Sequence, residues 1–368
     1  MTQHLTQLSI EQKVGQLFFV GIPGPEIDRP TRDLIDEVSP GGICLFTRNV
    51  KERQQTRGLL DELRSSIANR PFLSVDQEGG LVDRLRRIMT PLPAASKLAT
   101  VADAAELGYI IGESLYTLGF NMNFAPVVDV IDSSREKFSN GLFSRTFGRT
   151  KEDVVRMAAA FLEALQASGI SGCLKHFPGL AASRVDSHED LPLVEVDESE
   201  LTQIDLFPYI KLLETARIDA IMVAHAAFPV HRLQEVSQNG EFIPSSLSFN
   251  IVTKLLRDDL GFEGLVITDD LEMGAIIKNF GIGEACTEAI LAGADMLAIC
   301  ADPENIRAGY RFVLESAKCG VIPSDRLDQS IERIARAKAE LSEPPRFDLG
   351  RLERLSDRIN ILGERLAT

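Results

Sequence analysis

The chain has 368 residues, of which 44% are hydrophobic and 25% charged, and it carries a net charge of −15. This composition is typical of a globular protein, and the acidic excess argues against nucleic acid or anionic membrane as a main partner, because phosphate binding needs a concentrated basic surface. The apolar runs fall well short of the roughly 20 residues that span a bilayer, and the first residues lack the pattern of a secretory signal. Five cysteines without CxxC spacing predict reduced thiols, so we expect a cytoplasmic protein with neither a disulfide framework nor a zinc ribbon.

Eight short apolar runs recur along the chain, and each is followed by a helical pattern. Continuous apolarity is typical of strands that are buried on both faces of a parallel sheet. Helix starts are indicated by the capping-box spacing of Ser9 with Gln12 and of Thr150 with Asp153. The runs begin near Gly15, Gly42, Pro71, Phe120, Ile170, Ile218, Gly264 and Ala294. The pattern predicts a TIM-type (β/α)8 barrel. A doubly wound open sheet is the alternative, although no GxGxxG follows a strand.

No linker divides the chain, so we expect a single domain over residues 1–368. The barrel takes up about 10–300 of these residues, and C-terminal helices take up about 301–368. Charged helical stretches at 303–318, 324–341 and 350–365 predict a helical cap on the barrel.

Polar residues gather where the strands end, which is where a barrel of this type carries its catalytic groups. The segments are Asp76–Gly80 with Arg84 after the third strand, Arg145–Gly148 after the fourth, Lys175–Gly179 and Asp186–His188 after the fifth, His225 after the sixth, and Thr268–Asp270 after the seventh. Independent surface charges would not be expected to gather at the same end of five strands.

Each of these residues also has a purely structural interpretation. Asp270 could cap the helix that follows it, His225 could be a hydrogen-bonded structural group, and Gly79-Gly80 could form only a turn. Lys175 could be a solvated surface charge, although it directly follows the apolar run of its strand.

The set has the groups that are needed to break an acetal, which are a carboxylate facing the anomeric carbon and a proton donor beside the leaving oxygen. Asp269 is the candidate carboxylate, and His188 is the candidate donor because imidazole titrates near neutrality. Asp186, two residues before His188, could orient the imidazole and stabilise its cation. Clusters of acids, bases and cations also suit aldolases and metal-dependent hydrolases, so the spacing alone leaves these alternatives open.

The motifs together resemble glycoside hydrolase family 3, and within it the single-domain β-N-acetylhexosaminidases of bacterial peptidoglycan recycling. The resemblance extends from about residue 10 to residue 300, and the joint occurrence of the motifs in this order is specific. They are Val75–Gly80, Asn123–Val130, Arg145–Gly148, Lys175–Gly179, Asp186–His188, Leu255–Arg257 with Gly261-Phe262, and Ile267–Met273.

The resemblance implies a TIM-type barrel and a retaining double displacement. According to this resemblance, Asp269 matches the nucleophile of the family, His188 matches the general acid/base, and Asp186 matches the residue that pairs with this histidine. The sugar-binding positions of the family match Asp76, Arg84, Arg145, Lys175 and His176.

The chain departs from the pattern of its relatives at two places. Most relatives follow the Pro-Gly with His-Gly-Asp-Thr, whereas this chain reads Leu180-Ala181-Ala182-Ser183. Leu81 stands where an arginine is commoner. The first departure bears on loop motion and on binding of the leaving group. The chain also has no tryptophan and only four tyrosines, so short substrates held by hydrogen bonds suit it better than long polysaccharides.

The sequence therefore predicts an exo-acting β-N-acetylglucosaminidase that acts on muropeptide or chitooligosaccharide fragments through a covalent glycosyl-Asp intermediate. The alternatives are a related β-glycosidase or phosphorylase of other specificity, and a sugar-binding pseudo-enzyme. We expect a monomer that needs no cofactor or metal, since the histidines are scattered and no HExxH or CxxC occurs.

Overall fold

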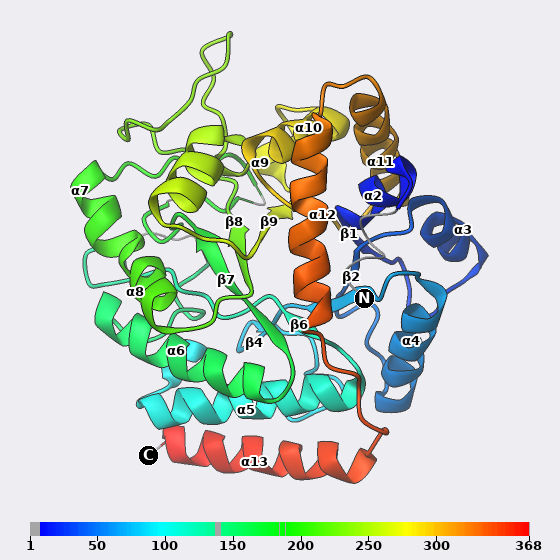
Figure 1. The fold of residues 1–368 in the computed structure, drawn as a ribbon. Coiled ribbons are helices and arrows are strands. Elements are labelled where there is room, and N and C mark those ends of the chain that lie inside the picture. Colours follow the sequence, from blue (N-terminus) through cyan, green and yellow to red (C-terminus); the bar gives the residue numbers. More distant parts are fainter. Residues whose placement is uncertain (1–7, 137–140, 184, 188, 368) are drawn as a thin grey trace.

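The structure, a computed structural model, describes residues 8–136, 141–183, 185–187 and 189–367. Parallel strands close into a barrel in the spatial order β1-β10-β9-β8-β7-β6-β3-β2 (Figure 1). The barrel strands are β1 (Phe18–Gly21), β2 (Gly42–Leu45), β3 (Phe72–Val75), β6 (Met122–Asn123), β7 (Ser171–Phe177), β8 (Ala220–Val223), β9 (Leu265–Asp270) and β10 (Met296–Ile299). Each lies within or beside one of the eight apolar runs, so the predicted (β/α)8 barrel is confirmed.

The barrel interior is filled by large side chains that meet across it from non-adjacent strands. The Phe19 ring lies 5.7 Å from that of Phe72 and 5.3 Å from that of Phe124. Gly42 on β2 makes room for this packing, because a Cβ atom there would lie 2.2 Å from the Phe19 ring. Strands buried on both faces explain why the sequence shows continuous rather than alternating apolarity.

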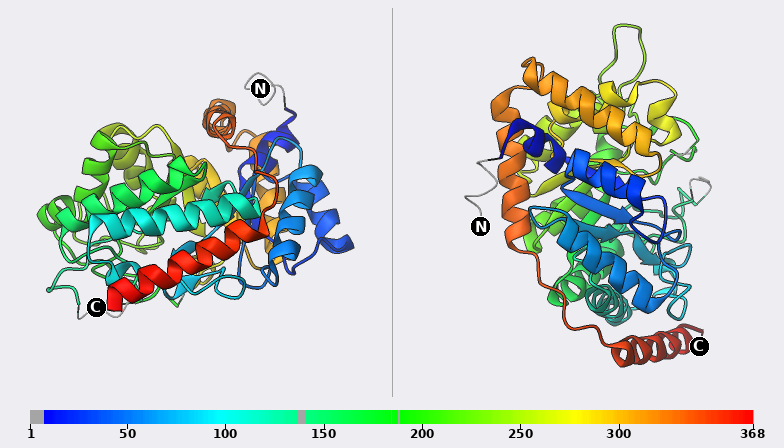
Figure 2. Two further views of the ribbon diagram at one scale, coloured as in Figure 1. Left: turned by 90° about the horizontal axis from the view of Figure 1, so that it is seen from below. Right: turned by 90° about the vertical axis from the view of Figure 1, so that its right-hand side faces the viewer.

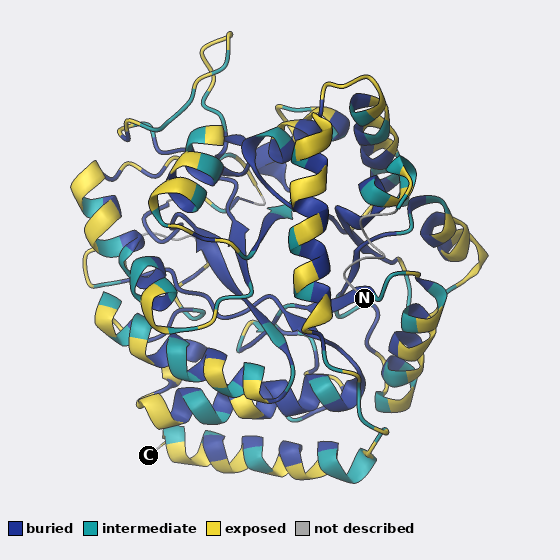
Figure 3. Cartoon of the chain, in the orientation of Figure 1, coloured by how far each residue is buried: buried dark blue, intermediate teal, exposed yellow. Residues whose placement is uncertain are grey.

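Helices surround the barrel and turn their apolar faces inward, as the dark inner and yellow outer surfaces in Figure 3 show. Thr150 caps α6 by accepting the Asp153 amide hydrogen, and Ser9 and Gln12 form the predicted capping box before α2. The helices before β10 are α2 (Ile10–Gln16), α3 (Arg29–Val38), α4 (Arg53–Ser66), α5 (Val101–Leu118), α6 (Lys151–Ala167), α7 (Glu198–Glu200), α8 (Phe207–Thr215), α9 (Gly274–Ile277) and α10 (Ile282–Ala292). The 3₁₀ segments are η1 (Ala95–Lys97) and η3 (Ser245–Leu247), and the π-helical segments are η2 (Leu201–Asp205) and η4 (Asn250–Asp259).

The last three helices have three different positions rather than forming one cap. Helix α11 (Pro303–Lys318) packs against α10, α3 and β1, so it belongs to the ring of helices around the barrel. Helix α12 (Ser324–Ala339) contacts α2 and β9 and crosses in front of the strands in Figure 1. Helix α13 (Leu349–Ala367) lies along α5, as the left view of Figure 2 shows. Of these three helices, only α12 crosses the strands at the amino end of the barrel, where Lys338 binds Gln16.

A small antiparallel hairpin follows β3 and was not predicted as strands. It pairs β4 (Gln77–Gly79) with β5 (Val82–Asp83). Gly79 and Gly80 have positive φ values of 98° and 59°, so the Gly-Gly pair does form the turn suggested by the sequence. None of the described helices combines the length and apolarity that crossing a bilayer requires.

Candidate active site

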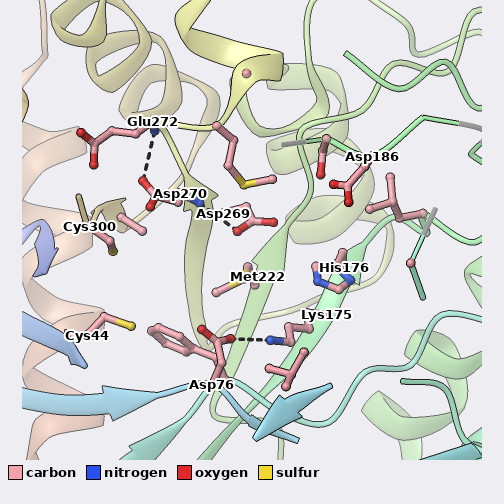
Figure 4. A pocket seen from close by; sticks show the side chains of 18 of the residues that line it. Cys44, Asp76, Lys175, His176, Asp186, Met222, Asp269, Asp270, Glu272 and Cys300 are labelled. Atoms are coloured by element: carbon pink, nitrogen blue, oxygen red, sulfur yellow. Dashed lines mark hydrogen bonds and ion pairs between the residues drawn. The ribbon is translucent and has the colours of Figure 1, made fainter. Parts of the chain in front are cut away.

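A cavity of about 630 Å³ lies at the carboxyl end of the barrel (Figure 4). Most predicted site residues line it together, although they come from loops and strand ends far apart in the sequence. They are Asp76, Arg84, Arg145, Lys175, His176, Asp186 and Asp269. His188 lies outside the described residues.

The floor of the cavity is a network of paired charges. Lys175, only 2% exposed, places its Nζ 2.6 Å from Asp76 Oδ1 and 2.7 Å from Glu78 Oε1. Arg145 donates to both oxygens of Glu78 at 2.8 and 2.9 Å. Lys175 is therefore not the solvated surface charge of the structural interpretation.

Opposite charges keep the floor ionised despite its burial. Burial alone would raise the pKa of Glu78, but Arg145 and Lys175 hold it well below its ordinary value. Burial would likewise lower the pKa of Lys175, whereas Asp76 and Glu78 raise it. The floor thus presents fixed charged donors and acceptors that can bind sugar hydroxyls.

His176 is oriented by a residue that sequence reasoning did not assign to the site. Asp129 Oδ2 lies 2.8 Å from His176 Nδ1, and Asp129 Oδ1 accepts the Leu180 amide hydrogen at 2.6 Å. Arg145 Nη2 lies 3.4 Å from the other ring nitrogen. Glu78 and Asp129 both lie inside the recognised motifs, and their position there was the signal available in the sequence.

Asp269 is the penultimate residue of β9, and its carboxylate lies on the side of the cavity where His176 and Asp186 lie (Figure 4). Its Oδ1 accepts the Asp270 amide hydrogen at 2.9 Å. Burial alone would raise the pKa of Asp269, but the His176 and His225 imidazoles and this amide lower it below its ordinary value. Asp269 is therefore an ionised carboxylate at a rigid strand end.

Asp270 also lines the cavity, on the side of Cys300 and Glu272 (Figure 4). Its Oδ1 accepts the Glu272 amide hydrogen at 3.1 Å, whereas α9 begins only at Gly274 with Met273 as its N-cap. The expectation that Asp270 caps the next helix is thus wrong, and it stabilises a turn instead. Burial and the nearby Glu272 and Asp269 carboxylates raise the pKa of Asp270 to about 7.

Asp186 lies in the loop that follows β7, and Figure 4 shows it on the same side of the cavity as His176. The next residue, Ser187, accepts a hydrogen bond from the Ala275 amide at 3.2 Å, which ties this loop to α9. Arg84 reaches the cavity from the turn after the β4–β5 hairpin, and its buried Nε has no hydrogen-bond partner among the described residues. The Arg84 guanidinium thus has donor capacity that the described residues do not use.

His225 has the structural role that its lone position suggested. It is fully buried, its Nδ1 lies 2.7 Å from Ser246 Oγ, and its Nε2 lies 3.0 Å from the Asp270 carbonyl oxygen. It thereby supports the strand end that carries Asp269.

The segment after Pro178-Gly179, where the sequence differs from the expected family pattern, is packed into the protein. Leu180, Ala181 and Ala182 are all buried, and Leu180 also lines the cavity. The apolar residues therefore anchor the start of the loop that carries Asp186. Within the described part of the chain, no group of three or more histidine, cysteine, aspartate or glutamate side chains is arranged to hold a metal ion.

Comparison with known proteins gives the site its context. The sequence profile of the glycosyl hydrolase family 3 N-terminal domain matches residues 9–337. The chain belongs to glycosyl hydrolase family 3. This result confirms the resemblance drawn from the motifs and the interpretation of the chain as a glycoside hydrolase.

Relatives within family 3 are similar along most of the chain. A beta-hexosaminidase from Vibrio cholerae is 30% identical over 335 residues, which cover 90% of this chain and 93% of the relative. Beta-hexosaminidase A from Pseudoalteromonas piscicida is 30% identical over 84% of this chain, which spans only 55% of that relative's length.

A solved family 3 structure has the same fold. The β-N-acetylglucosaminidase from Paenibacillus sp. str. FPU-7 superposes with a TM-score of 0.86 at 34% identity, over 96% of this chain and 69% of that one.

Proposed function

We propose that this family 3 enzyme is a retaining exo-β-N-acetylglucosaminidase that releases terminal β-linked N-acetylglucosamine from muropeptide or chitooligosaccharide fragments. The observation that carries the proposal is the ionised Asp269 carboxylate, held at a strand end beside a floor of paired charges. The names of the relatives, beta-hexosaminidase and β-N-acetylglucosaminidase, support the sugar. A cytoplasmic role in peptidoglycan recycling is part of the same proposal.

In the first step, an Asp269 oxygen attacks the anomeric carbon while His188 gives its proton to the leaving oxygen. The glycosidic bond breaks, the leaving alcohol departs, and the sugar becomes an ester of Asp269. A lowered pKa suits this role, because only the ionised carboxylate is a nucleophile.

In the second step, neutral His188 takes a proton from water, whose oxygen attacks the anomeric carbon and frees Asp269. Two inversions give net retention of configuration. Asp186 is proposed to orient the imidazole and to stabilise its cationic form, as the carboxylate of a triad does.

The remaining cavity residues are proposed to hold the sugar. Asp76, Arg84, Arg145, Lys175 and His176 would bind its hydroxyl groups. Their pairing with Glu78 and Asp129 fixes donors and acceptors before substrate arrives, which reduces the ordering cost of binding.

The test is turnover of 4-nitrophenyl N-acetyl-β-glucosaminide against 4-nitrophenyl β-glucoside, with and without phosphate. We expect hydrolysis of the first substrate, no sugar phosphate, and a β-anomer as the first product in proton NMR. An α-anomer would contradict the nucleophile assignment. Preference for the glucoside would favour a β-glycosidase of other specificity. Formation of a sugar phosphate would favour a phosphorylase, and lack of any turnover would favour a sugar-binding pseudo-enzyme.

The proposed pairing of Asp186 with His188 is tested by the pH dependence of kcat/KM in the variant Asp186→Ala. Loss of the carboxylate should lower the pKa of the His188 cation, so the alkaline limb of kcat/KM should move to lower pH by about one unit. If kcat/KM falls but its alkaline limb stays at the same pH, Asp186 has a structural role and does not act on His188.

A further inference from the structure

Four aliphatic side chains from three separate segments line the cavity, and we name them the aliphatic collar: Leu81, Leu180, Val185 and Ile277. They come from the tip of the β4–β5 hairpin, the loop after β7 and the end of α9. Three are exposed, with 71% of Leu81, 38% of Val185 and 50% of Ile277 open to solvent. Single exposed apolar residues are ordinary, but a group around one cavity indicates a surface that a ligand covers.

The hairpin part of the collar is held by its turn. A Cβ atom on Gly79 would lie 2.3 Å from the Pro93 carbonyl oxygen, and one on Gly80 would lie 2.7 Å from Ala94 Cβ. The hairpin is therefore packed closely against the segment at 93–94, and Leu81 keeps its place at the tip.

The loop part and the helix part of the collar are tied to each other. Ser183 Oγ donates to the Val185 carbonyl oxygen at 2.7 Å and accepts the Val185 amide hydrogen at 3.2 Å. The Ala275 amide, at the start of α9, donates to Ser187. A surface fixed in this way loses little entropy when it binds a ligand.

Two charged side chains that line the same cavity already have partners. Lys278 donates to the Glu189 carbonyl oxygen and lies 3.9 Å from Asp190. Glu272 accepts the amide hydrogens of Ala301 and Asp302 at 2.5 and 3.0 Å. A ligand that covers the collar therefore does not have to pair with either of these two charges.

Val185 connects the collar to the side of the cavity assigned to the leaving group. Val185 directly precedes Asp186, the proposed partner of the proton donor, and the donor must lie beside the leaving oxygen. The collar also contains both sequence departures, since Leu81 and Leu180 stand where relatives more often carry arginine and histidine.

We propose that the aliphatic collar is the leaving-group subsite and that it selects β-N-acetylglucosaminides whose aglycone presents an apolar surface about the size of a hexyl chain. This inference rests on the proposed function, because it assumes that the floor of the cavity holds N-acetylglucosamine.

The experiment compares hexyl and 5-hydroxypentyl N-acetyl-β-glucosaminide. The two aglycones have the same number of non-hydrogen atoms and similar alcohol acidity, so their difference reports the collar and not the chemistry. We expect kcat/KM to be about tenfold higher for the hexyl glycoside.

Variants of the collar should remove this preference. In Leu81→Asn/Ile277→Asn the ratio of the two kcat/KM values should fall to about one, since the methyl end then meets amides. Val185→Thr, which keeps the side-chain volume and so protects the fold, should lower the ratio partially. Ile361→Asn on α13, where Ile361 is 61% exposed and distant in the fold, is the matched control and should keep the full ratio.

The outcomes separate the two proposals. Equal kcat/KM values for the two probes, with N-acetylglucosamine released from both, would overturn the subsite and leave the proposed function intact. A preference unchanged in both collar variants would also overturn the subsite. Release from neither probe by the folded protein would overturn the proposed function and the subsite with it.

Discussion

Both ends of the barrel bury charged groups, but they use them differently. At the carboxyl end, Lys175 lies between Asp76 and Glu78, and the network faces the cavity. At the amino end, Asp295 is completely buried and pairs with Arg257 at 2.5 Å and Arg333 at 3.2 Å.

The hydrogen bonds beyond these pairs explain the difference. At the amino end, Arg257 also donates to the carbonyl oxygens of Phe262 and Gly264, and Asp295 accepts the Val266 amide hydrogen, so the ions fasten the backbone at the start of β9. At the carboxyl end, the ion pairs join side chain to side chain, and Asp76, Lys175 and Arg145 line the cavity. Buried charges thus stabilise the fold at one end, and at the other they prepare a surface for a ligand.

The largest effect that sharpens this contrast should come from Asp269→Ala. Loss of the nucleophile should lower kcat/KM by at least about 10⁴-fold without lowering the melting temperature. Asp270→Asn is the neighbouring control, and it should stay within about tenfold of wild-type activity because the amide oxygen still accepts the Glu272 N–H. Peptide mapping of a trapped glycosyl-enzyme would locate the sugar, and recovery on Asp270 would contradict the assignment.

At the amino end, Asp295→Asn should cost stability instead of activity. Removal of the carboxylate leaves buried arginines without compensation, so the free energy of unfolding should fall by about 3 kcal/mol. Denaturant unfolding measures this loss, and kcat/KM of the folded protein should change by less than about twofold. Asp328→Asn, an exposed ion-pair partner of Lys13, should cost less than about 1 kcal/mol. A large loss of activity in folded Asp295→Asn would contradict the purely structural role of the charges at the amino end.

Glu78→Gln tests the floor of the cavity. With one carboxylate neutralised, Lys175 and Arg145 lose their alignment, and kcat/KM should fall by about 10²-fold through weaker transition-state binding. Steady-state kinetics would show the fall, and Glu304→Gln, an exposed partner of Arg307, is the matched control. Activity equal to wild type would show that the floor needs no fixed charge at position 78.

A smaller effect should come from Lys338 at the amino end. Its Nζ donates to Gln16 Oε1 at 2.7 Å and to the Asn69 carbonyl oxygen, and burial lowers its pKa to about 7. Between about pH 7 and the ordinary value of 10.5 the unfolded chain binds this proton and the folded protein does not, so stability rises with pH in that window.

The measurement is denaturant unfolding of wild type and Lys338→Met at pH 7 and pH 9. Wild type should gain about 2 kcal/mol relative to the variant over this interval. Equal pH dependence in the two proteins would show that Lys338 keeps its ordinary pKa.

The strands were predictable because burial on both faces leaves continuous apolar runs, as in Phe18–Gly21 and Met296–Ile299. The β4–β5 hairpin was missed because strands of three and two residues are too short to show a period. The position of α11 could not be inferred from its charged sequence, since the apolar face that packs on the barrel emerges only from its contacts.

The site was predictable where residues end strands, as Lys175 and Asp269 do, because parallel strands bring those ends together. Glu78 and Asp129 were missed as site residues because they bind other side chains and not the cavity itself. Such partners depend on how two loops meet, which no single stretch of sequence records. The turn geometry after β9 likewise decided that Asp270 begins no helix.

The placement of α12 has a consequence for the order in which the protein matures during synthesis. Strand β1 pairs with β2 on one side and with β10 on the other, and Lys338 of α12 binds Gln16 of α2, so this first part of the chain gains its last partners almost 280 and more than 300 residues later. The nascent chain can form helices and adjacent strand pairs early, but the ring closes only after β10 has left the ribosome. Until α12 follows, the amino end of the barrel stays open, so synthesis that stops after β10 and before α12 leaves a closed ring of strands whose amino end is uncovered.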